Sequence, residues 1–341
     1  MTPWRTYADP PIPDPDRGRD DRRAAGRARR DEVGFDTALA GDASGFVVWM
    51  CADSLDAVAG PRGPVVDACQ VDDALPGPWE ADLLDLARRQ EWTGRAAEAM
   101  AEGYQQAIAS IAAEPLHSSR EQALRRARRL ADDVDPATAQ SSETAARRLV
   151  SPGLRLRHDR VAERWQSDVG PSGDISPELA QYRESLPEPM ARLAAGYRIG
   201  DALADGDGRL MVLLSRGADR DDVLLLEAVP VGASSREERY GVWRDGSDVQ
   251  RVLLAREVVP LVPADMPGWS TSPDGTTARV WSRARAARSG STWGGGRGSA
   301  RRLGAALGLL HAVGGDAPSL AGYLGHSRRF PAAVRSAVRD G

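Results

Sequence analysis

Apolar residues recur at helical spacing over several stretches of the chain, and polar or glycine-rich segments separate these stretches. From Glu80 to Ala113, for example, Leu86, Met100 and Tyr104 belong to a set of apolar positions that repeats every three or four residues. This period is typical of a helix that buries one face. Helices are predicted over 80–113 (as two helices), 119–133, 177–201, 249–262 and 301–313.

Shorter apolar runs, each close to acidic residues, indicate strands. GFVVWM (45–50) and PVV (64–66) predict two strands that flank a loop, and ARVWSRARA (278–286) predicts another. RLMVLLS (209–215) and DVLLLEAV (222–229) predict an antiparallel hairpin. In chain order the elements are a small sheet, helices, a second sheet and more helices. The sequence therefore predicts an α+β fold.

Residues 1–34 contain PPIPDPD followed by RGRDDRRAAGRARRDE, in which arginines are mixed with acids and apolar anchors are almost absent. This composition predicts a disordered or loosely helical arm. A basic arm that binds nucleic acid is the alternative. The interleaved acids, and the lack of aromatic residues in the arginine-rich part, favour a solvated segment instead.

Composition narrows the functional classes without naming one. The chain has 341 residues and a net charge of −4, so its overall charge does not attract it to nucleic acid or to anionic lipid. No apolar run reaches the roughly 20 residues that a membrane span needs, and the N-terminus lacks a signal-peptide pattern. We therefore expect a cytoplasmic protein with neither a nucleic-acid nor a membrane partner.

Two residue types are missing altogether. All 45 basic residues are arginine, and neither lysine nor asparagine occurs in the sequence. This excludes any mechanism that needs the ammonium group of lysine or the carboxamide of asparagine. Cys51 and Cys69 end strand-like segments that could be adjacent, but two thiols without a nearby histidine do not make a zinc site, and buried free cysteines are expected. His311 lies on an apolar helix face and is expected to be a hydrogen-bonded core residue.

Six segments of the sequence carry a resemblance to a known family. SGFVVWMCADSLDAVAG (44–60) and VVDACQVDDALPGPWEADL (65–83) resemble motifs of an uncharacterised bacterial family, domain of unknown function 2252. The resemblance covers about 290 residues, from roughly 35 to 330. The segments that continue it, in family order, are LAQYRESLP (179–187), LLLEAVPVGASS (224–235), VQRVLLAREVVPLVPADMPGW (249–269) and LHAVGGDAPSLAGYLG (310–325).

Members of this family look like distant relatives of kinases and aminoglycoside phosphotransferases. The resemblance therefore implies one kinase-like, two-lobe domain over 35–335, with a helical lobe at 80–200 and 300–335. The small-lobe sheet, at about 205–286, would be permuted to follow the catalytic loop. In that chemistry an Asp positions the acceptor hydroxyl, an Asn and a second Asp hold magnesium, and a Lys under a glycine-rich loop grips the phosphates.

The resemblance maps the catalytic and metal-binding parts onto residues that are mostly altered. The catalytic-loop Asp corresponds to Asp53, which is retained. The following His and Asn correspond to Leu55 and Val58, and the metal-binding Asp corresponds to Gln70. A valine offers no oxygen to magnesium, and a glutamine carbonyl offers no negative charge.

The phosphate-binding parts are altered as well. ADGDGR (204–209) stands in place of the glycine-rich loop; Gly206 and Gly208 remain, but the two aspartates would repel phosphate. The Lys-Glu-Ala segment of the family begins here with Leu226 and Glu227, so a leucine replaces the phosphate-gripping lysine.

These losses predict a pseudoenzyme: a phosphotransferase-like scaffold that binds an unknown protein or small-molecule partner and carries no cofactor. The alternative is an ATP- and Mg²⁺-dependent phosphotransferase with a rewired site that uses Asp53, Asp72 and an arginine such as Arg256. Asp67, Asp72 and Asp73 match acids of the family and could hold a metal. Taken singly, each is expected to cap backbone N–H groups near the turn and helix that follow.

Overall fold

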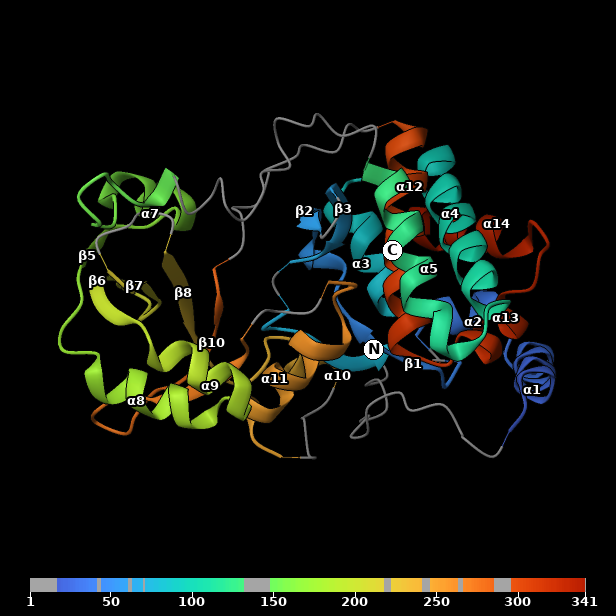
Figure 1. The fold of residues 1–341 in the computed structure, drawn as a ribbon. Coiled ribbons are helices and arrows are strands. Elements are labelled where there is room, and N and C mark those ends of the chain that lie inside the picture. The colour runs from blue at the N-terminus through green and yellow to red at the C-terminus, as the bar shows by residue number, and fades with distance from the viewer. Residues whose placement is uncertain are drawn as a thin grey trace.

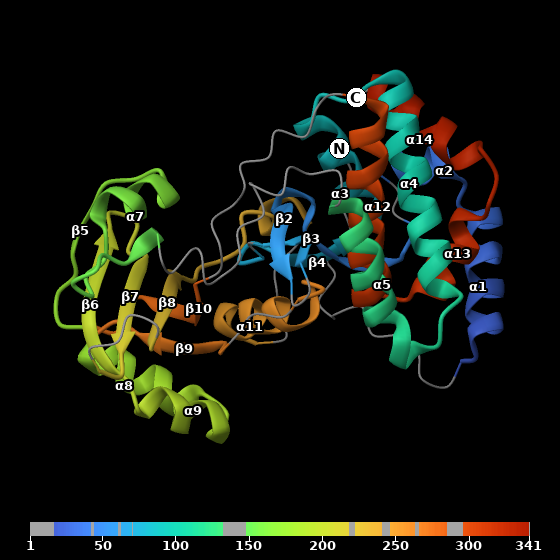
Figure 2. The ribbon, with the colours of Figure 1, turned by 45° about the horizontal axis from the view of Figure 1, so that its top comes forward.

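The chain folds into a mainly helical region and a six-stranded sheet, with helices α10 (Glu237–Tyr240) and α11 (Asp248–Val258) between them (Figure 1). Figure 2 shows α11 in the same place from another side. The helical region and the sheet have separate hydrophobic clusters. The prediction of a fold with both helices and separate sheets is confirmed. The structure, a computed structural model, describes residues 17–41, 44–60, 63–69, 71–131, 148–217, 222–240, 246–262, 266–284 and 296–340.

The helical region contains the largest hydrophobic cluster and confirms the helices predicted at 80–113, 119–133 and 301–313. Among the described residues, no helix is both long and apolar enough to cross a membrane. The helices of this region are α1 (Arg19–Glu32), α2 (Phe35–Leu39), α3 (Trp79–Arg89), α4 (Gly94–Ala112), α5 (Leu116–Ala131), α12 (Arg297–Gly314), α13 (Ala317–Leu324) and α14 (Arg329–Asp340).

Two small antiparallel sheets lie beside these helices. β1 (Val47–Met50) pairs with β4 (Leu75–Pro78), and β2 (Leu55–Gly60) pairs with β3 (Gly63–Ala68). The strands predicted at 45–50 and 64–66 are thus confirmed as β1 and β3. The sequence did not predict β2 or β4, because β4 consists of LPGP, which lacks the β-branched and aromatic residues that mark strands.

Helices α4 and α12 cross at very short distance, and glycines make this possible. A Cβ atom on Gly304 would lie 2.0 Å from the carbonyl oxygen of Met100, and one on Gly103 would lie 2.1 Å from that of Arg301. Any larger residue would force the helices apart. The close crossing brings Tyr104 of α4 next to α12.

The N-terminal segment is more ordered than its composition predicts. Residues 1–16 lie outside the described residues, but 19–32 form α1, which packs against α13. A Cβ on Gly26 would lie 2.0 Å from the carbonyl oxygen of Ser319, so the two backbones nearly touch. The expectation of a solvated arm is therefore corrected for α1. The sequence gives little sign of a packed helix here, because the buried face of α1 consists of glycine and Arg22 and lacks large apolar residues. Arg22 pairs with Asp316.

The second region is an antiparallel sheet with strand order β5-β6-β7-β8-β10-β9. The hairpin predicted at 209–215 and 222–229 is confirmed as β7 and β8, and the strand at 278–286 as β10. Alternate residues of β7 serve different cores: Val212 packs in one hydrophobic cluster and Leu213 in another. The strands are β5 (Val169–Pro171), β6 (Arg198–Asp205), β7 (Leu210–Ser215), β8 (Val223–Pro230), β9 (Gly268–Thr271) and β10 (Ala278–Arg283).

Three helices belong to the sheet rather than to the helical region: α7 (His158–Trp165), α8 (Ser176–Ser185) and α9 (Glu188–Ala195). α8 buries Leu179 and Tyr182 in the same cluster as Trp281 of β10. The expected helical lobe at 80–200 is therefore corrected, because the described part beyond residue 147 packs with the sheet. The helix predicted over 177–201 also ends earlier, since the chain enters β6 at Arg198.

Candidate functional site

Asp53, which the family resemblance aligns with a catalytic-loop Asp, lies in a short 3-10 turn (Ala52–Ser54) between β1 and β2. Asp82, in the first turn of α3, holds this turn in place. Its fully buried carboxylate accepts hydrogen bonds from the backbone N–H of Cys51 at 2.8 Å and of Ala52 at 3.1 Å. The position of Asp53 therefore depends on a carboxylate that lies 29 positions further along the chain.

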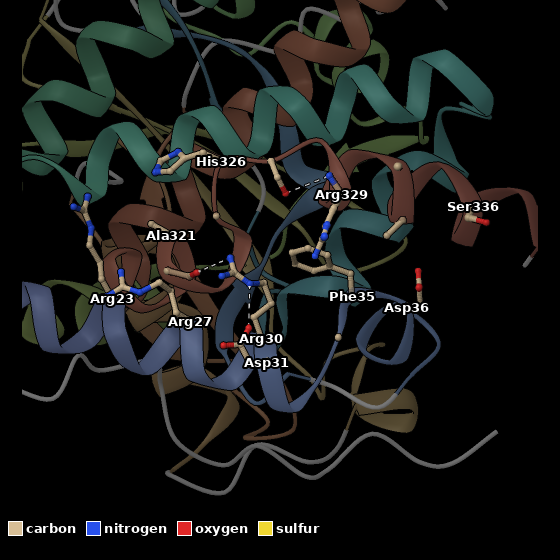
Figure 3. Close-up of a pocket in the computed structure, with 16 residues that line it drawn as sticks. Arg23, Arg27, Arg30, Asp31, Phe35, Asp36, Ala321, His326, Arg329 and Ser336 are labelled. Atoms are coloured by element: carbon tan, nitrogen blue, oxygen red, sulfur yellow. Dashed lines mark hydrogen bonds and ion pairs between the residues drawn. The ribbon is translucent and has the colours of Figure 1, made fainter.

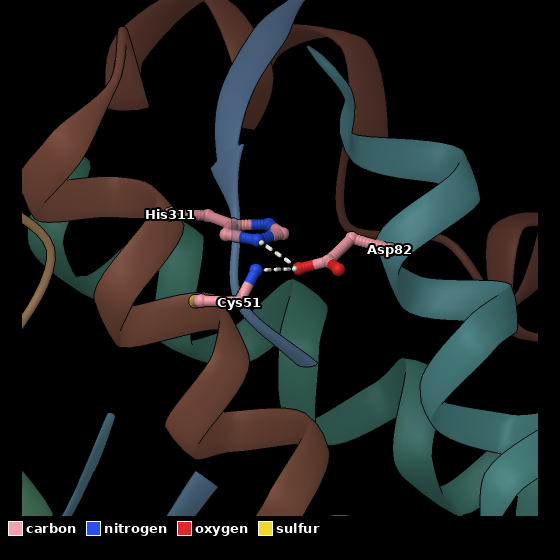
Figure 4. Close-up of side chains that lie close together, drawn as sticks. All are labelled: Cys51, Asp82 and His311. Atoms are coloured by element: carbon pink, nitrogen blue, oxygen red, sulfur yellow. Dashed lines mark hydrogen bonds and ion pairs between the residues drawn. The ribbon is translucent and has the colours of Figure 1, made fainter. Parts of the chain in front are cut away.

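Asp82 also ends a buried hydrogen-bonded chain. The Nε2 atom of His311, on α12, lies 3.0 Å from Oδ2 of Asp82 (Figure 4). The Nδ1 atom of the same ring lies 2.8 Å from the hydroxyl of Tyr104. Burial raises the pKa of Asp82, but the hydrogen bond from His311 and the positive charge of Arg236 outweigh it, so this pKa lies below its ordinary value. The ionised carboxylate accepts from Nε2–H, which leaves Nδ1 to accept from Tyr104. His311 is thus the hydrogen-bonded core histidine that the sequence predicts.

Cys51, Asp82 and His311 are residue types that bind zinc, and their ligand atoms lie within 4.8 Å of one another. They fit a hydrogen-bonded network better than a metal site, because both ring nitrogens of His311 already have partners. Burial raises the pKa of the Cys51 thiol well above its usual value, whereas zinc binds the thiolate. The guanidinium of Arg236 lies 3.4 Å from Asp82 and adds a positive charge next to the cluster.

Arg236 is the basic residue at the centre of the acidic site. One nitrogen of its buried guanidinium lies 2.8 Å from Asp53, a second lies 3.4 Å from Asp82, and a third lies 3.8 Å from Asp73. The contacts with Asp53 and Asp73 are ion pairs rather than well-directed hydrogen bonds. Burial lowers the pKa of Arg236, but the negative charges of Asp82 and Asp53 have the larger effect. The pKa therefore lies above its ordinary value, and the residue stays charged. Arg89 adds a longer contact of 3.6 Å to Asp53.

The three acids of the 65–73 stretch all bond to α11 or to the segments that precede and follow it. Asp67 accepts from the backbone N–H of Leu261 and Val262 at 2.8 and 2.9 Å. Asp73 accepts from the backbone N–H of Ser235 at 2.7 Å. These two acids do cap N–H groups as expected, although most of these groups come from a distant segment instead of the next helix.

Asp72 has a different partner, Arg256 of α11, at 2.7 Å. The same guanidinium donates to the hydroxyl of Ser282 on β10 at 3.1 Å. Arg256 therefore links the acidic stretch to strand β10 of the large sheet. The sequence alone named Arg256 as an example of an arginine that could supply charge to a rewired site, and the structure brings this residue to Asp72.

The altered family positions lie in hydrophobic surroundings. Val58 is buried on β2 opposite Val65, and Leu55 is half-buried at the start of the same strand. Leu226 is fully buried in the cluster that contains Trp281, so its side chain faces the core of the sheet. Gln70 lies outside the described residues. The three positions that the structure describes thus contribute to cores.

Glu227 and the 204–209 segment, which the resemblance aligns with a glycine-rich loop, make local contacts within the sheet region. Glu227 accepts from Arg164 and from the indole nitrogen of Trp165, both at 2.6 Å. Burial raises the pKa of Glu227, but the charge and hydrogen bond of Arg164 outweigh burial. The pKa therefore lies below its ordinary value, and the carboxylate stays ionised. Gly206 and Gly208 lie in a turn, as predicted, but the turn joins β6 to β7, because the chain enters β6 at Arg198, before the end of the helix predicted over 177–201. The side chain of Asp205 accepts backbone N–H bonds inside this turn, a role that needs no phosphate.

Comparison of the chain with protein-family models, with curated proteins and with solved structures found no match. The family resemblance therefore stays a prediction, and the site must be interpreted from its own geometry. Sequence reasoning missed Arg236 and Tyr104, which complete the network around Asp82. The only sequence signal for Arg236 is its place next to the SS pair of the family-like segment at 224–235.

Proposed function

We propose that this chain is a pseudoenzyme with a kinase-like, two-lobe fold, which acts as a binding or regulatory scaffold. One observation supports this most strongly: Arg236 is inserted among Asp53, Asp73 and Asp82. In a phosphotransferase of this type, the Asp that aligns with Asp53 faces the acceptor hydroxyl, and magnesium held nearby by a separate Asn and Asp supplies positive charge to the site. Here an internal guanidinium supplies the positive charge instead.

The exchange of a metal for an arginine has a chemical consequence. Magnesium requires oxygen ligands in octahedral geometry, and a guanidinium between the carboxylates takes the space and the negative charge that it needs. Arginine does not lose its proton in proteins, so the competition persists at every working pH. Asp72 is neutralised in the same way by Arg256. A scaffold function, which requires a stable surface and no metal, fits this arrangement best.

The first test is nucleotide binding, measured by thermal shift and calorimetry with millimolar ATP or GTP and Mg²⁺ or Mn²⁺. A ligand that binds only the folded state raises the melting temperature. We expect no shift that depends on Asp53. A shift that Asp53→Asn abolishes, while the exposed control Asp159→Ala retains it, would instead establish the rewired phosphotransferase.

The second test asks whether Arg236 replaces a metal. Arg236→Gln removes the shared cation, so the variant is expected to melt at a lower temperature than the wild type because three carboxylates then repel one another. Millimolar Mg²⁺ or Mn²⁺ should recover part of this loss in Arg236→Gln and leave the wild type unchanged. Arg164→Gln is the matched control, since it removes a buried arginine from Glu227, away from these acids. Equal metal responses in both variants would count against the proposal.

A further inference from the structure

A concave surface with a volume of about 1050 Å³ lies between α1, α13 and α14 (Figure 3). None of its lining residues belongs to the acidic site around Asp82. Ligand pockets in proteins commonly occupy about 300–1000 Å³, so this space is large enough for a complete small molecule. We call it the basic groove. Its charged lining residues are Arg23, Arg27, Arg30, Arg329, Asp31 and Asp36.

The spacing of the arginines on α1 places three positive charges on one side of the groove. Arg23, Arg27 and Arg30 are four and three positions apart, which puts them on the same helix face. Arg329 adds a fourth charge from the start of α14, and all four residues line the cavity in Figure 3. The lining also contains two acids, of which Asp31 lies 4.0 Å from Arg30, so the four arginines leave the groove with a net positive charge.

Of these four arginines, Arg30 has a structural role, and the other three do not. Arg30 donates to the carbonyl oxygens of Gly322 and Tyr323, each at 3.2 Å, and so fastens α1 to the end of α13. Within the described ranges, the guanidinium groups of Arg23, Arg27 and Arg329 have neither a hydrogen-bond nor an ion-pair partner. Arg22 of the same helix, by contrast, pairs with Asp316.

We infer that the basic groove binds a small molecule that carries two or more phosphate groups. Guanidinium groups match phosphate oxygens with two parallel hydrogen bonds, and each such pair combines charge with fixed geometry. Three guanidiniums that have no partner among the described residues are more than a single phosphate needs, and the groove is larger than a single phosphate. Because the whole chain has a net charge of −4, the attraction for phosphate comes from the arginines of the groove and not from the overall charge.

Calorimetry with inorganic tripolyphosphate tests the inference on the chain of 341 residues. The wild type is expected to bind it, and Arg27→Gln combined with Arg329→Gln should weaken binding about tenfold or more. Both side chains are exposed and neither has a partner among the described residues, so the double variant should keep the melting temperature of the wild type. Arg95→Gln is the control, because Arg95 is exposed on α4 outside the groove.

Several outcomes would overturn the inference. Absence of binding would do so, as would equal affinities in the double variant and the wild type, or an equal loss in Arg95→Gln. Tighter binding of a short single-stranded oligonucleotide or a hexaglutamate peptide than of tripolyphosphate would assign the groove to another class of ligand. A nucleotide shift that survives Asp53→Asn but disappears in the double variant would support this groove and leave the pseudoenzyme proposal intact.

Discussion

Replacement of Asp82 by alanine is expected to lower the free energy of unfolding by about 3–5 kcal/mol. The change removes the acceptor of the Cys51 and Ala52 backbone N–H groups and the partner of the His311 ring. All of these groups are buried, so water cannot replace the lost carboxylate, and Arg236 loses one of its acids. Urea denaturation, monitored by circular dichroism, measures the change.

Two further variants show whether the charge or the hydrogen bonds of Asp82 matter. Asp82→Asn keeps the size and one acceptor oxygen but removes the charge. We therefore expect its free energy of unfolding to lie between that of the wild type and that of Asp82→Ala. Asp159→Ala, an acid on the surface of α7 with a 63% exposed side chain, should change stability by no more than about 0.5 kcal/mol. A loss below about 1 kcal/mol for Asp82→Ala would show that the network around it does not hold the fold.

The second large effect concerns Glu80, next to Trp79 at the start of α3. Its side chain is fully buried; Oε1 accepts from the backbone N–H of Ser44 at 2.7 Å, while Oε2 has no partner among the described residues. Burial raises the pKa of Glu80 from 4.5 to about 7. The unfolded chain therefore binds fewer protons than the folded chain between these two pH values. Stability falls as pH rises through this window, by about 3 kcal/mol in total for this group.

Glu80→Gln is expected to remove this dependence, because the amide has nearly the same shape and no charge. Between about pH 4.5 and pH 8 the stability of Glu80→Gln relative to the wild type should rise by about 3 kcal/mol. Denaturation curves at a series of pH values measure it. Glu163→Gln, with a 70% exposed side chain, serves as the control and should run parallel to the wild type. If the stability of Glu80→Gln also runs parallel to that of the wild type across this pH range, the Glu80 carboxylate does not have the raised pKa that its burial implies.

Most helices and several strands could be predicted from the sequence, because their signal lies in the spacing of apolar residues within a few turns. α4, α5 and α12 carry apolar stripes, and β7 and β8 are runs of buried aliphatic residues. The failures have local causes as well. β4 consists mainly of proline and glycine, and α1 buries glycine instead of large apolar residues, so neither has the pattern that prediction needs.

The candidate site shows where such local signals end. The sequence alone selected Asp53, Asp72 and Arg256 and the lack of lysine and asparagine, since residue identity is visible without a fold. It could not determine that Arg236 contacts Asp53 or that His311 contacts Asp82, because these contacts join residues 183 and 229 positions apart. Long-range contacts depend on how helices and strands pack. Tertiary structure therefore decided that the acids face an internal arginine, and that the arginines of α1 share a groove with Arg329.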